Sequence, residues 1–163
     1  MKNLNSLYIK MIEYYKNDPK RIQHFCKVHS FAKLIAEMEN MSAKDLEILE
    51  TAALVHDIGI KISEQKYGNC SGKNQEKEGP AEAVRLLKEL DYPEDVIERV
   101  SYLVGHHHTY NNIDGLDYQI LVEADFIVNM YEDQESLSTC EKVYDRIFKT
   151  DSGRKIFKEM FGL

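Results

Sequence analysis

The sequence AALVHDIG at residues 52–59 is the stretch around which the rest of the chain is organised, because it runs from an apolar segment directly into an imidazole and a carboxylate. Burying His56 beside Asp57 is unfavourable unless a charged or polar group satisfies both side chains, and a divalent metal ion would do so. Leu49, Ala53 and His56 share one helical face, so we expect His56 to emerge on the core side where that helix ends. The glycine that closes the stretch would permit a turn or a close approach of another backbone.

Two further polar residues lie on predicted apolar stripes, one on each side of this stretch. His24 shares a stripe with Val28, in a helix that we expect to begin at Asp18 and the proline after it. Asp125 shares a face with Leu121 in a later helix. Together with the His-Asp pair, these positions predict that four side chains from three helices converge on one site.

The ordered pattern His24, His56-Asp57 and Asp125 resembles the HD superfamily of metal-dependent phosphohydrolases. The resemblance covers roughly residues 18–131. It implies an all-helical fold, the four pattern residues as metal ligands, and hydrolysis of a phosphate ester.

The resemblance also implies catalytic roles for Asp57 and Arg21. Asp57 would act both as a ligand and as a partner of the attacking water. Arg21 lies one helical turn before the first histidine, where similar enzymes use an arginine to hold phosphate. An ordinary salt-bridged surface arginine is the alternative, and Glu123 and Glu78 remain alternative acid–base candidates.

Two imidazoles and two carboxylates form a borderline-hard set of donors. Such a set suits a divalent ion, namely Mn, Fe, Co, Ni, Zn or Mg, and the donor types alone do not choose among them. A metal ion can lower the pKa of a bound water from about 15.7 to ~7 and can offset the charge of a phosphate. Both effects suit hydrolysis of a phosphoester.

A triple histidine at residues 106–108 follows another apolar helical stripe. Some members of the superfamily hold a second metal through a paired histidine at such a place, so the resemblance implies His106 and His107 as possible ligands of a second metal or of the substrate. A solvated turn with one packed imidazole is the alternative. Bimetal members also supply a histidine in the segment corresponding to residues 65–80, and this sequence has none there. Lys61 stands one position later than the lysine of the common HDxGK form, so no phosphate role carries over to it.

Helical periodicity predicts an all-α fold, a compact bundle of six to eight helices in one domain over residues 1–163. We expect an HD core at residues 18–131 and C-terminal helices at 135–163. Residues 60–79 hold three glycines and many charges with little periodicity, which predicts a long loop beside the metal. Gly79 and Pro80 would then begin the next helix.

Composition limits the kinds of partner and compartment. The net charge of −7 argues against a general nucleic-acid surface, which needs clustered lysine and arginine. Three isolated cysteines without a CxxC spacing favour a reducing compartment, so we expect a cytoplasmic protein. No apolar run approaches ~20 residues, so we expect neither export nor membrane insertion. The expected partner is a small phosphorylated substrate such as a nucleotide, and the oligomeric state is left open.

Three functions compete at this point. The first is a metal-dependent phosphohydrolase, favoured by the intact four-residue pattern. The second is a non-catalytic module that binds a nucleotide and signals through a partner. The third is a di-iron oxygenase on the same scaffold, which the missing histidine at 65–80 disfavours.

Overall fold

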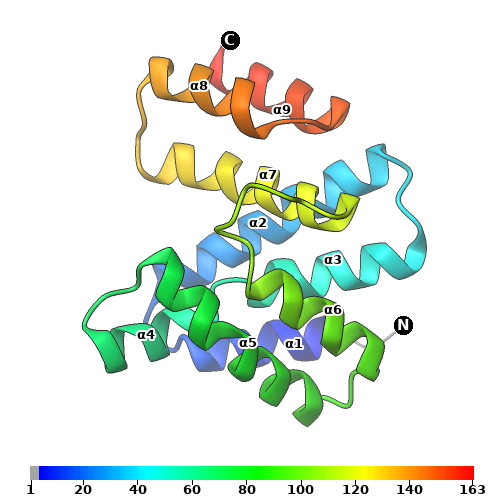
Figure 1. Cartoon of the computed structure of the whole chain (residues 1–163), viewed down its shortest axis with the longest axis vertical. Coiled ribbons are helices and arrows are strands. Elements are labelled where there is room, and N and C mark those ends of the chain that lie inside the picture. Colours follow the sequence, from blue (N-terminus) through cyan, green and yellow to red (C-terminus); the bar gives the residue numbers. More distant parts are fainter. Residues whose placement is uncertain (1–3) are drawn as a thin grey trace.

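The computed structural model describes residues 4–163, and these residues form only α-helices and turns (Figure 1). The helices are α1 (Leu4–Tyr14), α2 (Pro19–Met38), α3 (Ala43–Val55), α4 (Gly59–Tyr67), α5 (Gly72–Glu89), α6 (Glu94–Val104), α7 (Leu116–Glu132), α8 (Leu137–Ile147) and α9 (Asp151–Phe161). The predicted all-α architecture is confirmed within the described residues. None of these helices is long and apolar enough to cross a membrane.

Capping side chains begin both α2 and α3, and the first of them confirms the helix start predicted at Asp18. The Asp18 carboxylate accepts the backbone N–H of Arg21 at 3.2 Å, and α2 begins at the next residue, a proline. The Ser42 hydroxyl accepts the backbone N–H of Asp45 at 3.2 Å and so begins α3. Each cap satisfies an N–H that has no partner within its helix. With α2 begun at this point, His24 lies in the second turn of that helix.

The predicted loop at residues 60–79 is wrong, because α4 and α5 occupy nearly all of it. Gly68 takes the left-handed backbone conformation, with φ of 69°, that ends α4. The Ser71 hydroxyl then accepts the backbone N–H of Asn74 at 3.3 Å and begins α5. Pro80 therefore lies inside α5 and does not begin it. Packing of α5 against both α4 and α6 outweighs the weak local pattern, and α4 is the helix that the predicted count left out.

The long helix α2 lies at the centre of the molecule, between α3 and α7 (Figure 1). Buried side chains of these three helices, such as Ile35, Leu49 and Leu121, form the main part of the core. Helices α4, α5 and α6 pack in succession on one side, and α8 and α9 pack on α7 at the other. The second turn of α2, the end of α3 and the middle of α7 therefore meet inside the molecule.

Helices α4 and α5 touch through their backbones just after the His-Asp pair. A Cβ atom on Gly59 would lie 2.7 Å from the carbonyl oxygen of Gln75 and 2.9 Å from the Cα of Gly79. No residue larger than glycine fits at position 59 without a backbone shift. The predicted close backbone approach is thus confirmed, and it brings Gln75 next to the site described below.

Candidate metal centre

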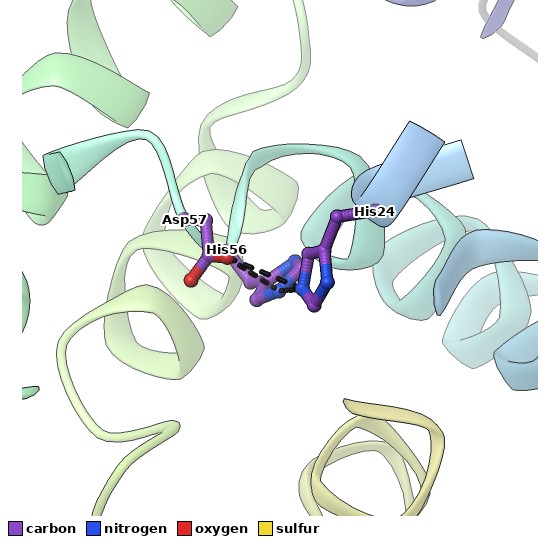
Figure 2. A group of neighbouring side chains, drawn as sticks. All are labelled: His24, His56 and Asp57. Carbon is purple, nitrogen blue, oxygen red and sulfur yellow. Dashed lines mark hydrogen bonds and ion pairs between the residues drawn. The ribbon is translucent and has the colours of Figure 1, made fainter. Parts of the chain in front are cut away.

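Four side chains from the central helices bring their polar atoms together. His24 Nε2 lies 3.2 Å from His56 Nε2, 3.2 Å from Asp57 Oδ2 and 3.2 Å from Asp125 Oδ1. His56 Nε2 lies 3.4 Å from Asp57 Oδ2 and 3.5 Å from Asp125 Oδ1. Figure 2 shows His24 reaching from α2 towards the His-Asp pair at the end of α3. The structure thus brings together the four residues that the sequence singled out.

Both imidazoles turn their Nε2 atoms into the cluster because their other nitrogens are bonded outside it. His24 Nδ1 donates to Glu132 Oε1 at 3.2 Å, and His56 Nδ1 donates to the carbonyl oxygen of Ala53 at 2.8 Å. A carboxylate and a carbonyl can only accept, so each Nδ1 carries the proton and each neutral ring has its lone pair on Nε2. Partners of this kind orient histidine ligands in metal sites.

The cluster concentrates negative charge in a buried place. His56 is 0% exposed and Asp125 only 3% exposed. Burial by itself lowers the pKa of His56, but the Asp57 and Asp125 carboxylates raise it well above its ordinary value. Burial likewise opposes ionisation of Asp125, but the imidazoles of His24 and His56, when they carry a second proton, donate to that carboxylate and hold its pKa below the usual range. The site therefore favours a positive charge at its centre, either a proton on an imidazole or a cation.

The donor atoms fit a divalent metal ion in both type and spacing. Nitrogen and oxygen ligands at ~2.0–2.2 Å from an ion lie roughly 3.0–3.5 Å from one another. The separations observed around His24 and His56 run from 3.2 to 3.5 Å. Two neutral imidazoles whose lone pairs approach to 3.2 Å would repel each other, and a cation between them removes that repulsion. His24, His56, Asp57 and Asp125 could therefore hold one ion.

A second group of possible ligands adjoins the first and shares Asp57 with it. It consists of Asp57, His107 and His108. His107 is 1% exposed, its Nδ1 donates to the Val104 carbonyl at 2.9 Å, and its Nε2 lies 3.3 Å from Asp57 Oδ1. Within residues 4–163 this buried Nε2 has no hydrogen-bond partner. A buried nitrogen left without a partner opposite a carboxylate is what a second cation would satisfy.

Of the neighbouring histidines, His108 reaches this group and His106 does not. His106 Nδ1 donates to the carbonyl oxygen of Tyr102 at 2.7 Å, and its ring stacks on Tyr102 with centroids 4.1 Å apart. His108 Nε2 donates to Gln75 Oε1 at 3.0 Å, and the Gln75 amide in turn donates to the Cys70 carbonyl at 2.8 Å. Burial lowers the pKa of His108 to about 4, so the ring is neutral near pH 7 and keeps its lone pair on Nδ1. Of the two histidines predicted for a second metal or the substrate, only His107 is at the site.

A pocket of about 300 Å³ opens from the first cluster to solvent. Arg21 lines it, with Nη2 at 2.5 Å from Glu64 Oε1 and Nη1 at 3.1 Å from Asp18 Oδ2. Lys20 also lines the pocket, is exposed, and makes no ion pair within the part of the chain that the structure describes. The entrance therefore has one guanidinium already paired with carboxylates and one free ammonium group.

Two residues of α7 that contact the cluster were not found from the sequence, and neither was Lys20 at the pocket entrance. Asn129 donates to Asp125 Oδ1 at 3.0 Å, and Glu132 accepts from His24. Their spacing of four and seven residues from Asp125 puts them on the same face of α7, and this polar stripe within an apolar helix is the signal that could have revealed them. Of the alternative acid–base candidates, Glu78 bonds to Lys66 and Tyr67 on the surface, and Glu123 lies in a separate buried network.

Comparison with known proteins agrees with this geometry. The family model for the HD domain matches residues 21–149. A crystal structure described as a predicted HD superfamily hydrolase, from an uncultured Thermotogales bacterium, superposes with a TM-score of 0.70 at 25% sequence identity. The alignment covers 98% of this chain and 85% of that one. No match was found among curated proteins.

Proposed function

The chain belongs to the HD-domain family, and from that premise we propose that it hydrolyses a small phosphate ester or nucleotide with the help of a bound divalent metal ion. One observation carries the proposal. The Nε2 atoms of His24 and His56 and the carboxylate oxygens of Asp57 and Asp125 face one another at 3.2–3.5 Å in a pocket open to solvent. Phosphoester hydrolysis needs an activated water and a counter-charge for phosphate, and such a set of donors can supply both through an ion.

Asp57 is the residue best situated to serve both ligand groups. When bound, an ion supplies Lewis acidity, which lowers the pKa of a water to ~7 and offsets phosphate charge. Asp57 Oδ2 lies 3.2 Å from His24 Nε2, and its Oδ1 lies 3.3 Å from His107 Nε2. The Tyr15 hydroxyl donates to the Asp57 carbonyl at 2.7 Å and fixes the backbone there. We therefore assign Asp57 a double role, as a ligand and as the group that orients the attacking water.

The pocket entrance supports a phosphate-binding role for Arg21 and Lys20. A guanidinium can hold a phosphate through two parallel hydrogen bonds, and an ammonium group can hold it as a point charge. Arg21 is bonded to Glu64 at 2.5 Å, so a phosphate must replace that carboxylate to reach it. Lys20 is exposed and can contact the phosphate without losing a partner. We assign the first contact with the substrate to Lys20 and the tighter contact to Arg21.

A second ion is part of the proposal. Asp57, His107 and His108 would hold it, and the buried His107 Nε2 without a hydrogen-bond partner is the observation that favours it. Gln75 accepts the Nε2 proton of His108 and so leaves Nδ1 as the ligating atom. This group offers fewer protein ligands than the first one, so we expect the second ion to bind more weakly.

The test combines metal analysis with turnover. The purified chain is analysed for bound metal by mass spectrometry, then loaded with each candidate ion and assayed with p-nitrophenyl phosphate and a panel of nucleotides. We expect at least one tightly bound equivalent of metal and metal-dependent release of phosphate. Tight nucleotide binding without turnover under any metal would instead support the non-catalytic module. Substrate-dependent consumption of oxygen by the iron form would support the oxygenase.

A matched pair of histidines on α2 provides the control. His24 and His29 are both buried on this helix, but His29 bonds to Tyr8 and Glu50 and lies outside the cluster. His24→Ala should lose the metal and the turnover, whereas His29→Ala should keep both. Equal metal content in the two variants would overturn the assignment of the site.

A further inference from the structure

A second hollow, of about 260 Å³, is lined by two aromatic rings. The rings of Tyr110 and Phe126 are 5.1 Å apart and inclined at 62°. Both residues are close in sequence to residues of the metal centre. Tyr110 comes two residues after His108, and Phe126 directly follows Asp125. Consecutive Cα atoms are about 3.8 Å apart and successive helical side chains diverge by ~100°, so Asp125 and Phe126 face adjoining spaces.

The opposite wall of this hollow carries two positive charges on α8. Lys142, Val143, Arg146 and Ile147 form this wall, and their spacing puts them on one face of the helix. Lys142 and Arg146 are exposed, and neither makes an ion pair with a carboxylate anywhere in residues 4–163. Like charges four residues apart on a helix repel each other. An anion placed between them would remove that repulsion.

We propose that this hollow is a second substrate subsite, which binds the base and a second phosphate of a nucleotide. This inference rests on the proposed function. The scissile phosphate lies at the metal centre, the base stacks against Tyr110 and Phe126, and the second phosphate pairs with Lys142 and Arg146. The preferred substrate is therefore a nucleotide with two separate phosphate groups, and not a simple phosphomonoester.

The dimensions and chemistry of the hollow agree with this occupant. A pocket for a whole drug-sized ligand encloses roughly 300–1,000 Å³, so a hollow of about 260 Å³ takes only part of a substrate. A base gains stability by stacking on an aromatic side chain, whichever base it is, because every base has a π-face. Two cations on the opposite wall suit a phosphate, in a chain whose net charge is −7.

The backbone just before Tyr110 is held in place by hydrogen bonds to α7 and α5. The Tyr118 hydroxyl shares its one proton between the carbonyl oxygen of His106, at 2.6 Å, and that of Thr109. The Thr109 hydroxyl donates to Glu76 Oε1 at 2.9 Å. The aromatic wall is therefore set before the substrate arrives, which reduces the conformational entropy lost on binding.

The experiment compares two nucleotides on the metal-loaded protein. Equilibrium dialysis measures the affinities of adenosine monophosphate and of adenosine 3′,5′-bisphosphate, and p-nitrophenyl phosphate turnover is followed in parallel. Because two charge-assisted hydrogen bonds are added, we expect the bisphosphate to bind at least about tenfold more tightly. The double variant Lys142→Gln, Arg146→Gln should lose this preference while p-nitrophenyl phosphate turnover stays within about twofold of the original.

A matched control removes the same charge elsewhere. Lys155 and Lys158 are exposed on α9 and do not line the hollow, so Lys155→Gln, Lys158→Gln should keep the bisphosphate preference. Equal binding of the two nucleotides by the original chain, or a preference that survives in the Lys142, Arg146 double variant, overturns the subsite. A clear preference with no turnover of any phosphate ester overturns the proposed hydrolysis and leaves the subsite standing.

Discussion

Helix α7 carries two buried carboxylates, Glu123 and Asp125, only two residues apart and in opposite surroundings. Glu123 is 0% exposed and Asp125 is 3% exposed, so both have lost almost all contact with water. Glu123 turns towards the C-terminal helices, and Asp125 turns towards the histidines of α2 and α3. Burial is therefore equal for the two residues, and only their partners differ.

Glu123 is fully satisfied by neutral hydrogen-bond donors of the chain itself. Its Oε1 accepts the backbone N–H groups of Lys149 at 2.7 Å and Thr150 at 2.9 Å and the Gln119 amide at 2.7 Å, and its Oε2 accepts the Thr150 hydroxyl at 2.5 Å. A Cβ atom on Gly153 would collide with the same carboxylate. Glu123 thus joins α7 to the start of α9 and needs nothing from outside.

Among the residues that the structure describes, Asp125 has only one neutral donor, the Asn129 amide at 3.0 Å. Its other close contacts are the Nε2 atoms of His24 and His56, whose protons are on their other nitrogens when the rings are neutral. Such a carboxylate is satisfied only when a positive charge enters the cluster. The comparison teaches that the partners of a buried carboxylate, and not its burial, distinguish a structural group from a metal ligand.

Asp125→Asn gives the largest expected effect, on metal and turnover. The amide keeps the shape of the side chain but removes the negative charge that the ion requires. We expect loss of bound metal and a fall in turnover of at least about 10³, because water activation by the ion is lost. Glu123→Gln is the control and should retain metal. If Asp125→Asn binds as much metal as the original chain, the distinction between the two carboxylates is wrong.

Glu123→Ala should give the reverse result, a loss of stability without a loss of metal. The substitution leaves the buried N–H group of Thr150 without its acceptor, and each unsatisfied buried group costs roughly 1–3 kcal/mol. We expect unfolding to become easier by about 3 kcal/mol, which for a chain of this length lowers Tm by roughly 6–12 °C. Calorimetry measures this change, and metal analysis of the same sample should give an unchanged stoichiometry. Loss of the metal in this folded variant would contradict the assigned role.

The sequence singled out Asp125 as a ligand, but it could not show that Glu123, named only as an alternative acid–base candidate, is a structural group. Helical stripes put His24, His56 and Asp125 on core faces, because an apolar stripe reports which side of a helix is buried. The partners of Glu123 at residues 149–150 lie 26 and 27 positions away in the chain, and no local pattern connects them. Which of two buried carboxylates meets neutral donors depends on how distant helices pack.

The loop predicted at 60–79 failed for a related reason. A proline at position 80 and scattered glycines weaken the local helical signal, yet α5 continues through the proline because it packs on both α4 and α6. The triple histidine shows the same limit. His106 and His107 were the two expected at the site, but the turn after α6 brings in His107 and His108 and leaves His106 outside.

Removal of metal should give the third largest effect, a fall in Tm that occurs only in chains that keep Asp125. A ligand that binds only the folded state stabilises it by about 2.7 kcal/mol when its concentration is 100 times its Kd. Chelation should therefore lower the Tm of the original chain by roughly 5–10 °C. The Tm of Asp125→Asn should not respond to a chelator, whereas that of Glu123→Gln should respond like the original. A response of equal size in Asp125→Asn would mean that the ion binds elsewhere.

The smallest expected effect comes from Glu132→Gln, because Glu132 contacts the cluster only through its hydrogen bond to His24. Glu132 accepts from His24 Nδ1 at 3.2 Å and pairs with Lys27 at 2.9 Å. Glutamine can still accept from the imidazole but without the charge, so we expect about a tenfold loss of metal affinity, at the low end for an outer partner of a ligand.

Glu50→Gln is the matched control, because Glu50 accepts from His29 Nε2 at 3.0 Å in a similar arrangement outside the cluster. Titration of the chelated protein with metal measures both variants. If Glu50→Gln weakens metal binding as much as Glu132→Gln does, the loss of affinity comes from removing a negative charge anywhere near α2. The orientation of His24 by Glu132 would then not set the affinity for the metal.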